Sequence, residues 1–177
     1  MSEWRRRFHA FSTRLYGPRP DVSSLTWLGQ ERIAIGCLPT PATLAALPEH
    51  GVTHIVNCRS MAQTWLSQDL ALERELLGVT RVAHAPMWDT GLPQPPELWA
   101  SAALFAADAL ATNQAARVLV HCHQGRRRSA MVAYAVLRLR GHDPAVAASL
   151  ITQHRVEAVL VPAYVDSVER WLRARDR

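Results

Sequence analysis

The sequence predicts one α/β domain with a central, mostly parallel, twisted sheet of about five strands and flanking helices. Short β-type apolar runs alternate with helical segments along the chain, which is typical of strands joined by helical crossovers. The 177 residues suffice for one domain with a complete core. We expect residues 21–177 to form this domain and residues 1–20 to form an extension before it.

Residues 3–16 of the extension are predicted to form a basic amphipathic helix. Apolar side chains recur at helical spacing, with arginines between them, at Trp4, Phe8, Phe11 and Leu15. Such a helix either caps the domain that follows it, docks on a partner, or makes peripheral contact with an anionic membrane. The sequence leaves these alternatives open.

The strands of the domain are predicted where short apolar runs stand between turn signals: residues 24–28, 32–36, 52–57, 80–84 and 117–121. Helices are predicted where apolar residues recur at helical spacing: from Pro41 to the stop at His50–Gly51, then 68–77, 95–112, from just after Arg128 to Leu139, 143–153 and 162–172. The helix after Arg128 is apolar on nearly every face, so we expect it to be buried.

Residues 118–129 read Val-Leu-Val-His-Cys-His-Gln-Gly-Arg-Arg-Arg-Ser. An apolar strand ends in Cys122, a turn with Gly125 follows, and a helix begins near Arg128. The amides of a tight loop and of a helix N-terminus form a concave site that suits a phosphate dianion. The same field stabilises a thiolate, so Cys122 is expected to have a lowered pKa and to act as a nucleophile.

The residues around Cys122 suit the same chemistry. Arg128 offers an always-charged fork that matches two phosphate oxygens. Gly125 permits the turn that points the amides inward. Ser129 places a hydroxyl where it can donate a hydrogen bond to a departing thiolate. The alternative interpretation is a buried structural cysteine beside a surface cluster of arginines.

The run from His121-Cys122 to Arg128-Ser129 resembles the His-Cys-x5-Arg-Ser/Thr signature loop of the cysteine-dependent protein tyrosine phosphatases, of the compact dual-specificity type. The upstream strand, Ile-Gly turn and helix, followed by the run from Gly51 to Asn57, are also similar to that family. The resemblance implies hydrolysis of phosphate monoesters through a phosphocysteine. His121 would support the loop, and phosphate would be held by the loop residues His123, Gln124, Gly125, Arg126, Arg127 and Arg128.

Residues 85–93 form a predicted Pro- and Gly-rich loop whose only acidic residue is Asp89. Cleavage of a phosphate ester needs a proton for the departing oxygen, and an aspartate on a movable loop suits that task. The order and spacing of Pro86-Met87-Trp88-Asp89 relative to Cys122 are similar to those of the general acid in the dual-specificity phosphatases. The alternative is a turn-forming aspartate without a chemical role.

The predicted catalytic residues are therefore Cys122, Arg128, Asp89 and Ser129. A dual-specificity or tyrosine protein phosphatase is the first expectation. A phospholipid or phosphoinositide phosphatase is the alternative, because the outward-facing side chains expected for His123, Arg126 and Arg127 favour a polyanion. A phosphate-binding module without turnover is a third and weaker alternative.

The composition indicates the cellular compartment and the charge of the partner, but it does not identify the ligand. The net charge is +5 and all 20 basic residues are arginines, which suits an acidic partner; we expect a phosphorylated protein or lipid and no nucleic acid. Three cysteines without regular spacing, and no apparent signal peptide or long apolar run, favour a reducing, cytoplasmic setting. No cofactor is expected, and the spacing around His121 and His123 fits phosphate better than a metal.

Cys58 and Arg59, which follow the third predicted strand, can each be interpreted in two ways. Cys58 is either a small core residue or a partner that traps oxidised Cys122 as a disulfide. Arg59 is either a solvated surface arginine or a flank of the phosphate site. The oligomeric state is not predictable from these patterns.

Overall fold

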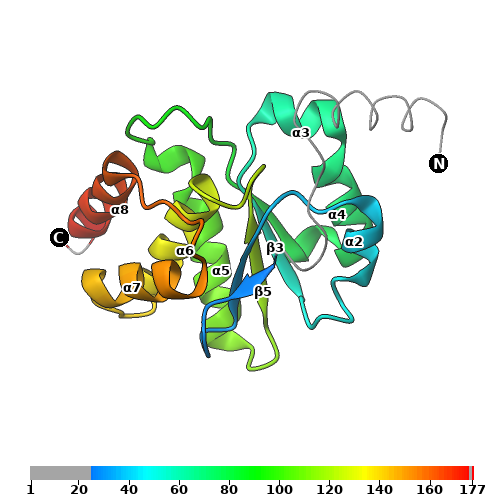
Figure 1. Ribbon diagram of the computed structural model, residues 1–177, viewed down its shortest axis with the longest axis horizontal. Coiled ribbons are helices and arrows are strands. Elements are labelled where there is room, and N and C mark those ends of the chain that lie inside the picture. The colour runs from blue at the N-terminus through cyan, green and yellow to red at the C-terminus, as the bar shows by residue number, and fades with distance from the viewer. Residues whose placement is uncertain (1–24, 176) are drawn as a thin grey trace.

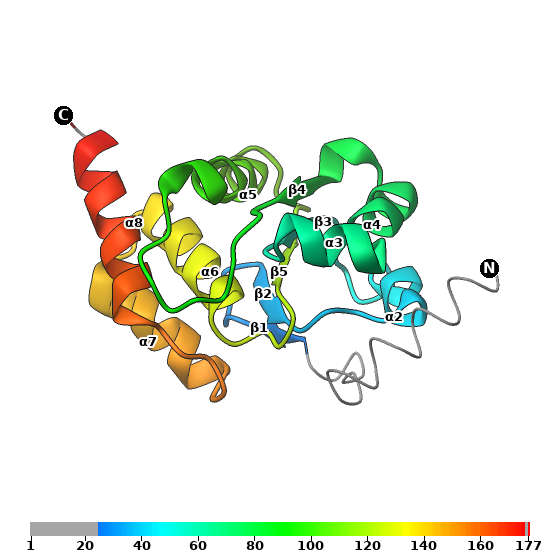
Figure 2. The same ribbon diagram turned by 90° about the horizontal axis from the view of Figure 1, so that it is seen from above.

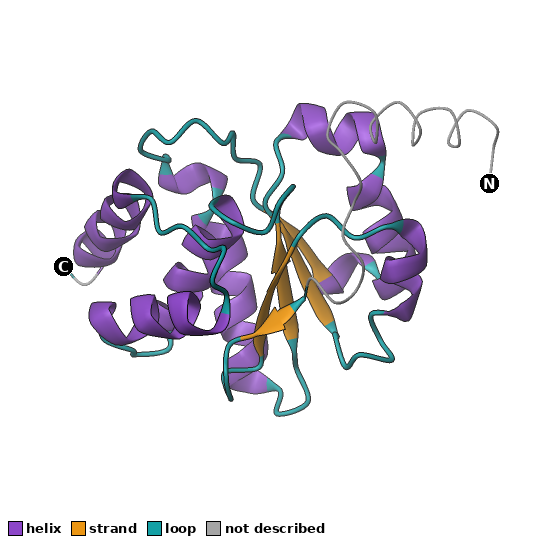
Figure 3. Cartoon of the chain, viewed as in Figure 1, coloured by secondary structure: helices purple, strands orange, loops and turns teal. Residues whose placement is uncertain are grey.

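The computed structural model describes residues 25–175 and 177, so the predicted extension and its helix at residues 3–16 lie outside the described residues. A five-stranded sheet crosses the centre in the order β1-β2-β5-β3-β4 (Figures 1 and 3). Its strands are β1 (Thr26–Trp27), β2 (Ile33–Gly36), β3 (His54–Asn57), β4 (Val82–His84) and β5 (Val118–His121). Only β1 pairs antiparallel, so the predicted mostly parallel sheet is confirmed.

Helices cover both faces of the sheet. Figure 2 shows α2, α3 and α4 on one side and α5 to α8 on the other. Their bounds are α2 (Pro41–Ala46), α3 (Met61–Ser67), α4 (Asp69–Leu77), α5 (Ala100–Thr112), α6 (Arg128–Leu139), α7 (Pro144–His154) and α8 (Pro162–Arg175). Two short 3₁₀ turns, η2 (Val79–Arg81) and η3 (Pro96–Leu98), precede β4 and α5.

The alternation of side chains along each strand divides the core into two layers. In β5, Val118 and Val120 face the larger cluster, with α5 and α6, while Leu119 faces the smaller cluster with Leu44 and Leu47. Because both faces are covered, the central strands are mostly apolar, and every residue of β2 and β5 is buried.

Helix α6 lies in the middle of the larger layer, and every residue from Arg128 to Leu137 is buried. This confirms the expectation that the helix after Arg128 is buried. The packing on all sides fixes the position of the α6 N-terminus relative to the end of β5.

The structure differs from the predicted elements in two places. Helix α3 was not predicted; it begins at a capping box in which Ser60 and Gln63 each satisfy the other's backbone N–H. The helix predicted over residues 95–112 is instead η3 followed by α5. The break falls at Trp99, whose completely buried indole donates to the Gln94 carbonyl.

The parallel register brings three chain segments to one edge of the sheet. Gly36, Asn57 and His121 are register partners at the carboxyl ends of β2, β3 and β5. Each is followed by a cysteine, so Cys37, Cys58 and Cys122 leave the sheet at the same edge. The loop of residues 122–128, called here the Cys122 loop, and the loop of residues 85–95, called the Asp89 loop, both begin at this edge.

Candidate active site

The carbonyl groups of the Cys122 loop are bonded to parts of the molecule outside the loop. The carbonyl of His123 accepts from the Leu38 amide at 3.2 Å, and that of Arg126 accepts from the Val159 amide at 2.8 Å. The carbonyl of Gly125 accepts from Arg155 Nε at 2.7 Å. With the carbonyls held outward, the loop amides are left to the inside, as an anion site requires.

Gly125 allows the loop to pack directly against strand β2. Its φ of +66° is in the left-handed region, and a Cβ built there would lie 2.5 Å from the Gly36 carbonyl oxygen and 2.7 Å from Arg155 Nη2. Both the backbone conformation and the close approach therefore require glycine. The sequence predicted the turn but not the packing against Gly36.

Cys122 is almost completely buried at the start of the loop, with Sγ 3.3 Å from the Ser129 hydroxyl oxygen. Burial raises the pKa of the Cys122 thiol, but the Arg128 charge, the Ser129 hydroxyl and the amides of Ser129 and Arg126 outweigh burial and leave the pKa below its usual value. The groups that were predicted from the sequence to surround Cys122 thus favour its thiolate over its thiol.

Arg128 is buried, and its guanidinium is held by acceptors from three segments. Nη1 donates to Gln63 Oε1 at 2.8 Å, to the Met87 carbonyl at 3.1 Å and to the Cys58 carbonyl at 3.3 Å. Nε makes no hydrogen bond within the described chain and lies 3.8 Å from Asp89 Oδ2. The guanidinium is thus fixed on one side and retains an unsatisfied buried donor on another, which an anion would satisfy.

Asp89 lies opposite the loop, where the sequence predicted an acid. Its side chain is about one-third exposed, and its Oδ1 lies 3.1 Å from Arg127 Nη1. The hydroxyl of Tyr164 donates to the same oxygen at 3.3 Å. The Asp89 loop is therefore positioned with its carboxylate against the arginines of the Cys122 loop.

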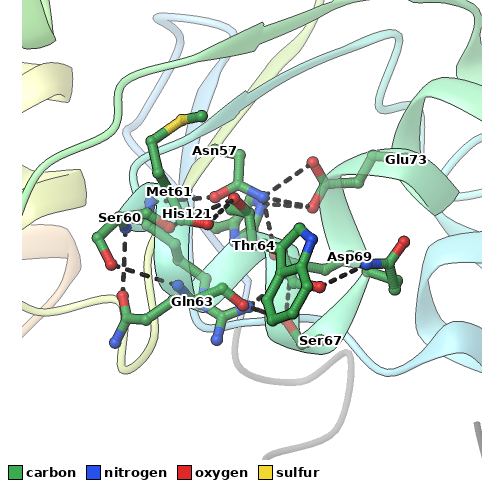
Figure 4. Close-up of polar contacts among 12 residues, drawn as sticks. Asn57, Ser60, Met61, Gln63, Thr64, Ser67, Asp69, Glu73 and His121 are labelled. Carbon is green, nitrogen blue, oxygen red and sulfur yellow. Dashed lines mark hydrogen bonds and ion pairs between the residues drawn. The ribbon is translucent and has the colours of Figure 1, made fainter.

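A buried polar network lies behind the loop, on the α4 side (Figure 4). His121 Nε2 is 2.8 Å from Glu73 Oε1, and neither side chain is exposed. Burial lowers the pKa of His121, but the charge and hydrogen bond of Glu73, assisted by Asp69, outweigh burial and raise it. The amide of Asn57 donates to both Asp69 and Glu73 and so ties α4 to the end of β3.

Arg59 belongs to this network, and its interpretation as a solvated surface arginine is wrong. Its side chain is buried, and Nη1 is 2.6 Å from Asp69 Oδ1. Burial raises the pKa of Asp69, but Arg59, Ser67 and Asn57 outweigh it, so that the pKa is lowered. The ion pair with an acid at the start of α4 stabilises Arg59 in the interior.

The remaining predicted loop residues differ in exposure. Gln124 and Arg126 are exposed, His123 is partly buried, and Arg126 Nε donates to the Glu157 carbonyl at 3.2 Å. Arg127 was expected to face outward at the rim; its guanidinium is about one-third exposed and is paired with Asp89. Two predicted site residues, Arg127 and Asp89, thus contact each other.

Cys58 lies beside Cys122 in the strand register, but its thiol is poorly suited to act as a nucleophile. Burial, followed by the nearby Cys122, raises the pKa of Cys58 well above its usual value. Neither Cys58 nor Cys122 forms a disulfide in the structure. A disulfide between Cys58 and an oxidised Cys122 stays a prediction.

Four residues that support the site were not predicted from the sequence: Gln63, Glu73, Arg155 and Tyr164. The Ser60-x-x-Gln63 spacing is a capping-box signature that would have located α3 and with it Gln63. Glu73, Arg155 and Tyr164 act from helices or loops distant in the chain, and no local pattern indicates them.

The described residues contain neither a metal-binding cluster nor a membrane-spanning helix. No three His, Cys, Asp or Glu side chains among residues 25–175 and 177 are arranged to hold a metal ion. No helix in this part of the chain is long and apolar enough to cross a membrane.

The strand order and the position of the Cys122 loop between β5 and α6 define the fold of the compact dual-specificity phosphatases. Human DUSP28 is 21% identical, with a TM-score of 0.69 over 90% of this chain and 99% of its own. Tk-PTP in its active form is 20% identical, with a TM-score of 0.68 over 86% and 97%. PTPMT1 in complex with PI(5)P is 18% identical, with a TM-score of 0.68 over 82% and 94%.

These proteins resemble the chain in fold only, because their sequence identity to it is low in every case. No protein-family model matches the chain, and no curated protein matches it. What the site does must therefore be argued from its own residues.

Proposed function

We propose that the protein is a phosphate monoester hydrolase that works through a phosphocysteine on Cys122. One observation carries the proposal. Arg128, which helps to lower the pKa of the buried Cys122 thiol, also lies 3.8 Å from the carboxylate of Asp89 on a separate loop. The fold shared with DUSP28, Tk-PTP and PTPMT1 supports it.

In the first step, the Cys122 thiolate attacks phosphorus in line. A sulfur–phosphorus bond forms while the bond to the ester oxygen breaks, and the leaving oxygen takes its electron pair and a proton from Asp89. Arg128 and the amides of the loop stabilise the charge on the three equatorial oxygens.

In the second step, water attacks the phosphocysteine. Asp89, now ionised, takes a proton from the water, the sulfur–phosphorus bond breaks, and Cys122 departs as a thiolate. Ser129 assists because its hydroxyl lies within hydrogen-bonding reach of the sulfur. The cysteine must stay reduced throughout, so we place the protein in the cytoplasm.

Hydrolysis of a generic aryl phosphate tests the mechanism. Cys122→Ser should abolish turnover while keeping the affinity for phosphate or vanadate, and Asp89→Asn should lower kcat about a hundredfold. Full activity of Cys122→Ser would overturn the mechanism. Phosphate binding by the wild type without any turnover would identify a binding module instead.

We infer a dual-specificity or tyrosine protein phosphatase as the first candidate, because the chain has the compact layout of DUSP28 and Tk-PTP. A panel of phosphotyrosine and phosphoserine peptides tests this candidate. Turnover of the peptides at rates close to those of the best aryl phosphate would support it.

A phospholipid phosphatase is the second candidate, and the surroundings of the site favour it. Seven of the eleven large hydrophobic side chains exposed in the described chain belong to three segments bonded to the Cys122 loop. We call these side chains the apolar rim: Met61, Trp65 and Leu66 on α3, Trp88 and Leu92 on the Asp89 loop, and Val156 and Val159 before α8.

Each rim segment is joined to the Cys122 loop by a hydrogen bond or an ion pair. Gln63 of α3 accepts from Arg128, Asp89 pairs with Arg127, and the Val159 amide donates to the Arg126 carbonyl. A cationic loop bonded to segments that expose apolar side chains suits a phosphate on an amphiphile at a membrane surface, where tryptophan is favoured. PTPMT1, which has the same fold, was solved with PI(5)P bound.

Vesicles distinguish the two candidates. Wild type, Trp65→Gln and the control Val146→Gln, which changes an exposed residue of α7 outside the rim, would be assayed on a soluble aryl phosphate and on vesicles containing a phosphoinositide or phosphatidylglycerol phosphate. The lipid candidate predicts that Trp65→Gln loses activity on vesicles only. Equal activity of all three proteins on vesicles would contradict it.

A further inference from the structure

We infer that Arg127 and Tyr164 form a clamp that positions the Asp89 carboxylate over the Cys122 loop. The inference rests on the proposed function, since it assigns positioning residues to the same reaction. The two residues come from different elements: Arg127 immediately precedes α6, and Tyr164 is in the first turn of α8.

Both residues of the clamp contact the same carboxylate oxygen. Arg127 Nη1 lies 3.1 Å from Asp89 Oδ1, and the Tyr164 hydroxyl donates to that oxygen at 3.3 Å. The Arg127 guanidinium also lies 6.0 Å from the centre of the Tyr164 ring, within the range of a cation–π contact. The two residues therefore orient each other as well as Asp89.

Tyr164 also binds the backbone of the Asp89 loop. Its hydroxyl accepts from the Gly91 amide at 3.0 Å while donating to Asp89. The tyrosine is nearly completely buried, so its hydroxyl is fixed by the packing of α8. Burial, and then the Asp89 charge, raise the pKa of Tyr164 despite the Gly91 amide and Arg127, so the hydroxyl keeps the proton that it donates.

A second contact holds the far end of the same loop on α8. The Gln94 amide donates to the Ser167 hydroxyl at 3.1 Å, one turn along the helix from Tyr164. The Asp89 loop is thus fastened to α8 at two positions, and Arg127 joins it to the Cys122 loop.

Gly91 allows Arg127 to approach the loop. It has a φ of +76°, and a Cβ built there would lie 2.8 Å from Arg127 Nη2. A side chain at this position would displace the guanidinium from the place where it meets Asp89.

The contacts of the clamp fix the position of Asp89 for both steps of the proposed reaction, the formation and the hydrolysis of the phosphocysteine. Arg127 and the Tyr164 hydroxyl are donors, and with Arg128 they are the groups that face the Asp89 carboxylate. They hold the carboxylate in one place relative to the Cys122 loop, and both steps require that positioning.

Steady-state kinetics on an aryl phosphate test the clamp in two backgrounds. Arg127→Ala and Tyr164→Phe should each lower kcat about tenfold, because each removes one hydrogen bond to a charged group. In the Asp89→Asn background the same changes should lower kcat less than about twofold, since they act through Asp89. Equal losses in both backgrounds would overturn the inference.

Arg126→Ala is the matched control for charge. It removes an arginine from the same loop, but that side chain is bonded to the Glu157 carbonyl and not to Asp89. If both Arg126→Ala and Arg127→Ala raise KM, the shared rise measures how much the positive charge of either arginine attracts the phosphate substrate. The fall in kcat should be specific to Arg127→Ala, and an equal fall in both variants would mean that charge alone is at work.

Hydrogen exchange of the full chain without substrate tests the clamp independently of activity. Arg127→Ala and Tyr164→Phe should speed exchange in residues 85–95 severalfold, while Arg126→Ala should leave that segment as protected as in the wild type. Unchanged exchange in both clamp variants would overturn the positioning role. If the wild type hydrolyses no phosphate ester but the exchange result holds, the proposed function fails and the clamp stands.

Discussion

Glu73 and His121 form an ion pair in the interior, with Oε1 and Nε2 2.8 Å apart and neither side chain exposed. Glu73 comes from α4, and His121 is the last residue of β5, directly before Cys122. The charge of Glu73 is what outweighs burial and raises the pKa of His121. The pair joins a helix on one face of the sheet to the residue directly before the Cys122 loop.

Glu73→Gln should cost about 3 kcal/mol of stability at pH 6, because it removes one partner of a buried ion pair. A pKa raised by folding gives stability that is fully present below the ordinary pKa of histidine and is lost as pH rises through the raised value. The difference between wild type and variant in urea unfolding should therefore shrink between pH 6 and pH 9.

Glu75→Gln is the control for that experiment, since Glu75 is an exposed acid on the same helix. It should leave the urea midpoint almost unchanged at both pH values. If the two variants unfold alike, the ion pair contributes nothing net to stability.

Ser129→Ala should raise the pKa of Cys122 and lower kcat about tenfold to a hundredfold, because the thiolate loses a hydrogen bond from a buried hydroxyl. The rate of alkylation by iodoacetamide as a function of pH measures the pKa directly. Ser101→Ala, at an exposed position of α5, is the matched control. An unchanged alkylation profile would show that Ser129 does not bond the thiolate.

Gly125→Ala should cost more stability than Gly141→Ala. Both glycines have positive φ, but a Cβ at Gly141 meets nothing within 4 Å, whereas one at Gly125 meets the Gly36 carbonyl at 2.5 Å. Gly141→Ala therefore measures backbone strain alone, about 1 kcal/mol, and Gly125→Ala adds overpacking of about 1–3 kcal/mol. Thermal unfolding of the two variants compares them, and equal costs would contradict the close approach.

Arg155→Met should destabilise the protein by about 3 kcal/mol and weaken phosphate binding. Arg155 is buried and donates to the Gly125 and Ile35 carbonyls and to Thr26, so it joins the loop to the first two strands. Phosphate should raise the Tm of the wild type more than that of the variant. Arg170→Met, which changes an exposed arginine of α8, is the control and should show the same rise in Tm with phosphate as the wild type. If phosphate raises the Tm of all three proteins equally, Arg155 does not support phosphate binding.

The sequence predicted the parts of the site that follow one another along the chain. The strand, the loop and the helix around Cys122 form a continuous pattern whose residue types and spacing predict an anion site, and Asp89 stood out as the only acid of a polar loop. The sheet was predictable because apolar strands alternate with helices. These inferences depend on local periodicity and on the chemistry of neighbouring residues.

The missed features depend on contacts between distant segments. Glu73 looks like any acid of a surface helix, and only the packing of α4 against β3 and β5 makes it a buried partner of His121. Arg59 was misjudged for the same reason, because its partner Asp69 is brought near by the turn between α3 and α4. Periodicity predicts which face of a helix is buried but not which polar group it meets there.

The Asp89–Tyr164 contact also bears on how the protein is made. The central pairing of β2 with β5 joins residues more than eighty positions apart, and Tyr164 lies close to the C-terminus. Topologies of such long range fold slowly. During synthesis, Cys122 and Asp89 would both leave the ribosome before α8, so the contact between Asp89 and Tyr164 should form only after α8 has emerged.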